Sequence, residues 1–250
     1  MHKPTIVAML RLKNEERWVR KTLDVLSEIC SGIVIVDDGS TDNTVKICES
    51  FSKVVEIHKQ SNLPYGEVRD KNTLLKMALK QNPDYLLFID GDEVIHPNSK
   101  KILFEELTIL YPNTDVFEFQ SLFIWDKPNQ YRYDGIYSSI WERRLIRMKN
   151  QPKDLQYEGT PFPNNRHSPH IPQRSVGFNQ SVRSRVKILH YGYYDEALRQ
   201  SKYKFYISLD PNNTVFDAYK HTISGEGKLS GPRGMEFKTI PEGMYVPDIK

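Results

Sequence analysis

The stretch DYLLFIDGDE, Asp84–Glu93, decides the fold of this chain. Its apolar run, residues 85–89, is short and aromatic-rich, and lies between a proline and a glycine. This pattern is typical of a buried strand rather than a helix. Because residues i and i+2 of an extended chain point to the same side, Asp90 and Asp92 are expected to converge just beyond the end of the strand.

The carboxyl ends of strands form the ligand-binding edge of open α/β sheets. Two carboxylates at that edge repel each other unless a cation lies between them. Hard divalent cations such as Mg²⁺ and Mn²⁺ prefer oxygen ligands of this kind. The alternative is a polar loop after a core strand, and the Asp-Gly-Asp motif alone does not separate the two interpretations.

The first 95 residues alternate buried strands with amphipathic helices. Strands are predicted at residues 5–10, 33–36, 54–57 and 85–89, and helices after an N-cap at Asn14 (with an apolar face from Trp18 to Ile29), at 45–51 and up to about Leu79. Such alternation predicts a parallel sheet with helices on both faces. The polar segments after Leu10, Val36 and Ile89 should therefore meet at one edge.

The rest of the chain is less regular. A helix is predicted at about 98–110, strands at 115–125, 142–148 and 186–189, and a second helix at 195–209. Residues 131–137 are interpreted as a loop over the site and 157–174 as a long functional loop. Residues 211–250 are expected to be mostly irregular.

Composition limits the function classes. With 250 residues, 38% hydrophobic and 27% charged, the chain has the make-up of a soluble globular protein. No apolar run approaches ~18 residues, and the N-terminus enters a strand pattern without a signal-peptide signature. Cys30 and Cys48 lack metal-ligand spacing and are interpreted as free thiols, so a cytoplasmic location is expected. The net charge of +3 is too small to argue for nucleic acid.

Arginines are concentrated in the middle and late chain: Arg143, Arg144, Arg147, Arg166, Arg174, Arg183 and Arg185. They suit either an anionic ligand or an ordinary solvated face. Peripheral contact with anionic lipid head groups stays open, although no amphipathic anchor is evident.

Two further segments have both a binding and a structural interpretation. Asp38-Gly39-Ser40 follows a strand, so its carboxylate could accept hydrogen bonds from a base or ribose, or form an Asx-type turn. Arg69, near the start of a helix, could bind a phosphate bidentately or be an ordinary solvated arginine.

Taken together, four segments resemble the family 2 glycosyltransferases of the GT-A fold. They are AMLRLKNEERWVRKTLDVL (8–26), VIVDDGSTDNT (34–44), GEVRDKN (66–72) and LLFIDGDE (86–93), in the family's order and spacing. The resemblance is strong over 4–110 and weak over 111–205. It implies an α/β fold with a mostly parallel sheet flanked by helices and a smaller mixed sheet. It also implies a single domain, 1–250, with a nucleotide-sugar-binding half (1–95), an acceptor-binding half (96–210) and an irregular extension (211–250).

The resemblance assigns roles to individual residues. It implies a nucleotide-sugar site formed by Leu10, Arg11, Asp38, Ser40, Arg69, Asp90 and Gly91, with Asp38 on the base. In the family an asparagine follows the arginine that matches Arg69, but here the next residue is Asp70. Asp90 and Asp92 would contact the ribose and a diphosphate-bound Mn²⁺ or Mg²⁺. His190, at a strand end, is a candidate further metal ligand or a packed, hydrogen-bonded histidine.

Family members like this chain invert the anomeric centre and use a carboxylate as general base. Where relatives carry a His-Glu pair, this chain has Thr160-Pro161-Phe162. Glu142 is the first candidate for the base, followed by Glu158 and Asp134. The alternative for Glu142 is an ion pair with Arg143 or Arg144.

The sequence therefore predicts an inverting, metal-dependent glycosyltransferase that uses a nucleotide-sugar, with UDP- and GDP-sugars first. The acceptor would be a glycan, a lipid-linked sugar or a protein. A sugar nucleotidyltransferase is disfavoured because the first loop, RLKNEE (11–16), is not glycine-rich. A non-catalytic nucleotide-sugar or glycan-binding module remains the alternative from another class.

Overall fold

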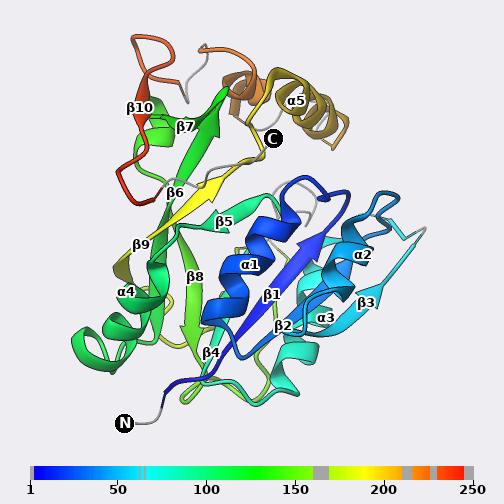
Figure 1. Ribbon diagram of the computed structural model, residues 1–250, viewed down its shortest axis with the longest axis vertical. Helices are drawn as coiled ribbons and strands as arrows, with labels where there is room; N and C mark the ends of the chain where they lie inside the picture. The colour runs from blue at the N-terminus through cyan, green and yellow to red at the C-terminus, as the bar shows by residue number, and fades with distance from the viewer. Residues whose placement is uncertain are drawn as a thin grey trace.

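The computed structural model describes residues 3–61, 63–64, 66–159, 169–209, 216–225 and 230–244. Its elements in chain order are β1 (Ile6–Leu12), α1 (Val19–Ile29), β2 (Gly32–Asp37), α2 (Thr44–Glu49), β3 (Val54–Lys59), α3 (Glu67–Leu79), β4 (Tyr85–Phe88), β5 (Glu93–Ile95), α4 (Ser99–Glu105), the π-helix η1 (Glu106–Leu110), β6 (Val116–Trp125), β7 (Lys127–Arg132), the 3₁₀ helix η2 (Gly135–Ser138), β8 (Trp141–Arg147), β9 (Val182–His190), α5 (Glu196–Leu209), the 3₁₀ helix η3 (Phe216–Thr222) and β10 (Phe237–Thr239). Figure 1 shows them in space.

The N-terminal half is a parallel sheet in the order β4-β1-β2-β3. Leu12 of β1 pairs with Asp37 of β2, and Met9 pairs with Phe88 of β4. This register brings the ends of β2 and β4 to the same edge. The predicted meeting of the polar segments at one edge is therefore confirmed.

The second half extends the sheet with antiparallel strands. β8 pairs antiparallel with both β4 and β6, and β7 and β10 continue the path beyond β6. β9 lies parallel to β6 and antiparallel to β5, the short strand that follows the Asp-Gly-Asp turn. In Figure 1, α5 lies beyond the arrowhead of β1, toward the end of the sheet where the polar segments meet. The α/β class, with a sheet flanked by helices, is as predicted.

Alternate residues of β1 pack into two different core layers. Ile6, Ala8 and Leu10 pack in the cluster that contains the buried face of α1, Val19–Ile29. Val7 and Met9 pack in the cluster that contains the buried face of α3. Because both faces of the strand are buried, its sequence is continuously apolar instead of alternating.

Two local predictions were wrong, and one strand is longer than predicted. Asn14 does not cap the first helix: its φ is +56° and its side-chain oxygen accepts a hydrogen bond from the Thr41 backbone N–H at 2.8 Å. The helix begins at Val19, because residues 14–16 are used to tie the first loop to the loop after β2. The segment 131–137 is not a loop, since it contains the end of β7 and η2. The strand predicted at 186–189 is the end of a longer one, β9.

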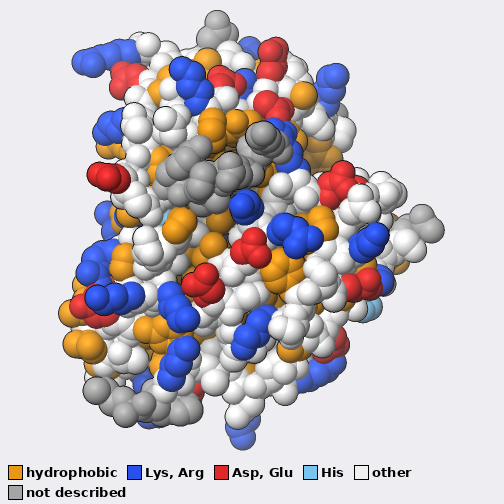
Figure 2. Space-filling model, viewed as in Figure 1, with side chains coloured by type: hydrophobic (Ala, Val, Ile, Leu, Met, Phe, Trp, Pro, Cys, Tyr) orange, Lys and Arg blue, Asp and Glu red, His pale blue; other side chains and the backbone are white. Residues whose placement is uncertain are grey.

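Both cysteines are buried free thiols, as predicted, and burial raises the pKa of each to about 12. Within the described ranges, no helix is long and apolar enough to cross a bilayer. Figure 2 shows basic and acidic side chains intermingled on one face of the molecule. The arginines of the second half do not act as one surface: Arg144 is buried, and Arg174 and Arg185 pair with nearby glutamates or aspartates. Arg166 lies outside the described residues.

Candidate functional site

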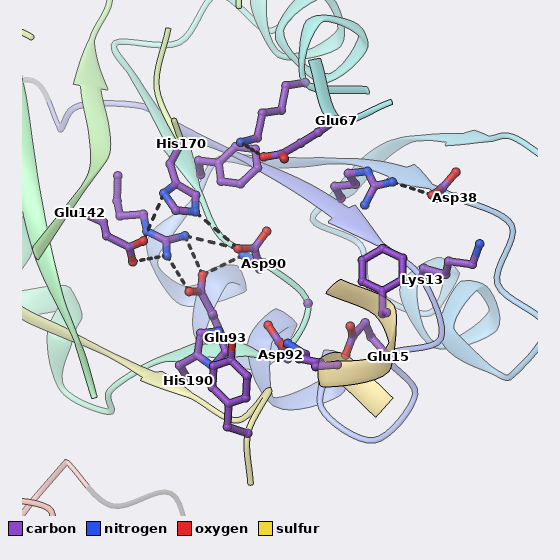
Figure 3. A pocket seen from close by; sticks show the side chains of 18 of the residues that line it. Lys13, Glu15, Asp38, Glu67, Asp90, Asp92, Glu93, Glu142, His170 and His190 are labelled. Carbon is purple, nitrogen blue, oxygen red and sulfur yellow. Dashed lines mark hydrogen bonds and ion pairs between the residues drawn. The ribbon is translucent and has the colours of Figure 1, made fainter. Parts of the chain in front are cut away.

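A cavity of about 780 Å³ opens at the carboxyl ends of β1, β2 and β4. Its lining includes Arg11, Asp38, Asp90, Gly91, Asp92, Glu142 and His190, all of which the sequence had singled out. Figure 3 shows Asp38 and Glu142 on opposite sides of this cavity with Asp90 between them. The edge of the sheet thus presents acidic groups to one open cavity.

The Asp-Gly-Asp turn is held tightly against the first loop. The Asp90 backbone N–H donates to the Glu93 carboxylate at 2.9 Å, which closes the turn. A Cβ atom on Gly91 would lie 2.6 Å from Glu15 Cγ and 2.6 Å from Leu12 Cδ2. Only glycine allows this approach, so the turn and the loop after β1 form one wall of the cavity.

Behind the turn, one buried arginine contacts three carboxylates. Arg144 of β8 donates to Glu93 at 2.7 and 2.6 Å and to Glu142 at 2.7 Å, and it lies 3.7 Å from Asp90. Burial raises the pKa of Glu93 to about 8, with further increases from Asp90 and Glu142 that Arg144 only partly offsets. A single guanidinium does not balance three charged carboxylates, and the raised pKa of Glu93 favours its protonated form near neutral pH.

His170 lies between two of these carboxylates. Its Nε2 is 3.6 Å from Asp90 Oδ2 and its Nδ1 is 3.7 Å from Glu142 Oε1 (Figure 3). The other oxygen of Glu142, Oε2, accepts hydrogen bonds from Arg144 and from Ser121. Burial lowers the pKa of His170, so the neutral imidazole is favoured there. Burial alone would raise the pKa of Glu142, but Arg144 and His170 lower it to about 2.

The second aspartate has a different partner. Lys202 of α5 places its Nζ 2.8 Å from Asp92 Oδ2. Burial opposes the charge of this lysine, but Asp92 raises its pKa. Glu15 lies beside Asp92 (Figure 3), and burial together with the Asp92 charge raises the pKa of Glu15 to about 9. A Cβ on Gly192 would lie 2.2 Å from both Lys202 Nζ and Asp92 Oδ2, so the chain leaves room for this ion pair only with glycine there.

His190 is beside Asp92, where the sequence placed it. Its Nδ1 accepts a hydrogen bond from the Gly192 backbone N–H at 3.1 Å, so the neutral ring carries its proton on Nε2. The ring also stacks on Tyr193, with centroids 5.5 Å apart, and packs against Phe123. The packed, hydrogen-bonded role is thus visible, and the role of metal ligand stays a prediction.

On the opposite wall, Asp38 is held by neighbours. Arg11 donates to it at 2.5 Å and Gln60 donates at 3.0 Å. Arg11 also bonds to the buried Asp70 at 2.7 Å. Asp70, which stands at the position of the family's asparagine, therefore helps to hold Arg11 against Asp38.

Five sequence candidates, Asp134 and the four that follow, are not among the described residues that line the cavity. Arg69 turns away to bond Asp70 and the Pro64 carbonyl. Ser40 accepts a bond from the Asn14 N–H, and Leu10 is buried in the core. Glu158 is exposed near Arg174, 3.9 Å away.

Asp134, the third candidate for the base, lies in a structural ion pair. It bonds Arg132 at 2.6 and 2.7 Å and accepts from the Gly231 N–H. Burial is outweighed by these bonds, which lower its pKa. The segment Thr160-Pro161-Phe162 lies outside the described residues.

The donor set suits a divalent cation that shares its ligands with a diphosphate. In the part of the chain that the structure describes, no three His, Cys, Asp or Glu side chains converge as a metal cage. Mg²⁺ in phosphate-transferring sites uses one or two carboxylates and takes its other ligands from phosphate and water. Asp92 already holds a stand-in cation, the Lys202 ammonium. The two aspartates of the turn therefore fit such an ion.

The side chains that contact the Asp-Gly-Asp turn were not predicted from the sequence. His170 and Lys202 have no local pattern that marks them, although His170 falls in the stretch predicted to be a functional loop. Glu15 had a signal, because it belongs to the KNE segment of the first loop.

Known proteins share features with this chain. The family model described as glycosyl transferase family 2 matches residues 11–165, more than half of the chain. An uncharacterized protein of Methanocaldococcus jannaschii is 34% identical over 92 residues, which are 35% of this chain and 40% of that protein. The dTDP-rhamnosyl transferase RfbG of Shigella flexneri is 32% identical over 95 residues, 35% of this chain and 33% of RfbG. The chain thus spans two fifths or less of the length of these relatives.

Among solved structures, Staphylococcus aureus TarS, residues 1–349, aligns with a TM-score of 0.49 and 15% identity. The alignment covers 88% of this chain and 69% of that one.

Proposed function

The chain belongs to glycosyl transferase family 2, and from that premise we propose that it moves a sugar from a nucleotide-sugar to a carbohydrate-bearing acceptor, with inversion. One observation carries the proposal: Asp38, Asp90 and Asp92 leave parallel strands at one edge and line one cavity with Glu142 and His170. The nucleotide would lie on the Asp38 side and the acceptor on the Glu142 side, with the anomeric carbon over the Asp-Gly-Asp turn.

The reaction is a single displacement. The acceptor oxygen forms a bond to the anomeric carbon while the bond from that carbon to the diphosphate breaks. A Mn²⁺ or Mg²⁺ held by Asp92 and Asp90 would neutralise negative charge on the departing diphosphate. Arg11 and Asp38 would hold the nucleoside end in place.

We assign the acceptor's proton to the Glu142–His170 pair. Arg144 and Ser121 both bond Oε2 of Glu142, which leaves Oε1 directed toward His170. A hydroxyl group bound between these two side chains would meet a carboxylate oxygen and an imidazole nitrogen. Proton transfer by a positioned side chain contributes roughly 10²–10⁴-fold to a rate.

A thermal-shift panel of UDP-, GDP-, dTDP- and CMP-sugars, with and without Mn²⁺, tests donor use. The dTDP-sugars belong in it because RfbG is similar to this chain. A ligand at 100 times its Kd stabilises the native state by about 2.7 kcal/mol. We expect one nucleotide class to give a Mn²⁺-dependent shift that Asp92→Asn abolishes. No shift with any donor would contradict the proposal.

Turnover then separates the transferase from the second candidate, a non-catalytic binding module. Asp38 is paired with Arg11, and Glu142 is paired with Arg144. A module that only binds the donor would show the same ion pairs. We expect Glu142→Gln and His170→Gln to keep the donor-induced shift and to lower turnover at least about 100-fold. Donor binding by the wild type without transfer or hydrolysis would favour the binding module.

A further inference from the structure

Lys202 reaches the Asp-Gly-Asp turn from a part of the chain 110 residues away. Its ammonium bonds Oδ2 of Asp92, and the residue lines the same cavity as Asp90 and Glu15. The family's assigned residues give it no role. It nevertheless contacts the carboxylate that the proposed function assigns to a divalent cation.

We propose that Lys202 is an internal counter-ion that occupies the cation position on Asp92 while donor and metal are absent, and that it gives up Asp92 when the divalent cation binds. The inference rests on the proposed function, because it concerns the same aspartate. Its consequence is that the free enzyme holds divalent cations weakly and binds them well only with a diphosphate.

The charges at the turn favour a replaceable cation. Asp92 faces the Lys202 ammonium at 2.8 Å, and Asp90 lines the same cavity. A divalent ion brings twice the charge of the ammonium and takes oxygen ligands from both the protein and a diphosphate. It therefore outcompetes a lysine once the diphosphate is present.

Lys202 is placed to move, whereas Arg144 is not. Its side chain is 29% exposed and bonds Asp92 from a flexible four-carbon stem. Arg144 is 1% exposed and is fixed by bonds to two carboxylates. Of these two cations, only the lysine has a partly exposed side chain.

The helix that carries Lys202 is anchored close by. Arg199 donates to the carbonyls of Tyr193 and Tyr194 at 3.0 and 3.1 Å and lies 2.9 Å from an oxygen of Asp126. These bonds hold the first turn of α5 to the β-sheet side. The exchange should therefore be a side-chain movement, with α5 itself staying in place.

The test is a titration of the whole protein with Mn²⁺ alone, followed by electron paramagnetic resonance of free Mn²⁺. Lys202→Met keeps the volume of the stem and removes the charge, and Lys204→Met, on the exposed side of the same helix, is the matched control. We expect Lys202→Met to bind Mn²⁺ roughly tenfold tighter than the wild type, the equivalent of one charge-assisted hydrogen bond. Lys204→Met should match the wild type.

An unchanged or weaker Mn²⁺ affinity in Lys202→Met, including no binding by either protein, would overturn the inference. Lys202→Gln should show the same increase in Mn²⁺ affinity. Agreement between the two variants excludes a folding defect of one of them as the cause. Donor binding in excess EDTA separates the two proposals. If Lys202→Met loses donor affinity there, the ammonium is itself the diphosphate's partner and the counter-ion role is wrong, while the transferase proposal stands.

Discussion

Replacing Arg144 by methionine removes the only cation that touches both Glu93 and Glu142 in the described structure. The side chain is 1% exposed and donates three hydrogen bonds of 2.6–2.7 Å. Removing one partner of a buried ion pair costs about 3–5 kcal/mol, because the remaining charges stay buried without a counter-charge. For a chain of this length that lowers the melting temperature by roughly 6–20 °C.

The loss should grow with pH. Without Arg144, the folded-state pKa of Glu93, already raised to about 8, rises further, and that of Glu142 rises from about 2 because its main stabilising charge is gone. A carboxyl group with a raised folded pKa contributes stability that is present at low pH and lost as pH rises through that pKa. The deficit of Arg144→Met relative to wild type should therefore be larger at pH 8 than at pH 5.

The assay is thermal unfolding followed by circular dichroism at pH 5, 6.5 and 8. Arg174→Met is the control, because Arg174 is 49% exposed and its ion pairs are on the surface. Such pairs contribute about 0–1 kcal/mol. If Arg144→Met melts within about 2 °C of the wild type at pH 8, the carboxylates do not depend on this arginine and the reasoning is wrong.

Three further predictions follow from the walls of the cavity. Glu15→Gln removes a group whose pKa is raised to about 9, so the melting temperature of the variant relative to wild type should be higher at pH 8.5 than at pH 5; a constant difference would contradict that raised pKa. Gly91→Ala forces a Cβ to within 2.6 Å of Leu12 and should cost about 1–3 kcal/mol in urea unfolding, whereas Gly32→Ala, with 3.5 Å of clearance, should be close to neutral; equal stabilities would remove the close-approach argument. Asp38→Ala should weaken donor binding about tenfold or more in calorimetric titration, and wild-type affinity would place the nucleoside elsewhere.

The sequence was sufficient for the fold because its signals are local. The continuous apolar runs of β1 and β2 follow from burial on both faces, and parallel pairing then sets Asp37 and Asp90 at one edge. Asn14 is an example of a local pattern that does not determine the structure. An asparagine before acidic residues predicts an N-cap, but the same residues can instead join two loops. Only the contact with Thr41 distinguishes the two.

The site was less predictable because its important contacts are distant in sequence. Glu93 and Arg144 are 51 residues apart, and nothing near either one encodes the pairing. His170 and Lys202 likewise reach the turn only through the tertiary fold. The sequence also does not determine the direction of a side chain. Arg69 lies on the predicted helix, but its guanidinium donates to the Pro64 carbonyl and does not line the cavity.

The long reach of Lys202 to Asp92 also bears on the order in which the protein is synthesised on the ribosome. The parallel strands β1 to β4 emerge first, and domains tend to fold from the N-terminus as they appear. Until β8 and α5 have followed, Glu93 lacks Arg144 and Asp92 lacks Lys202. A nascent chain that stalls before residue 202 would therefore carry Asp92 without the ammonium that pairs with it in the finished protein.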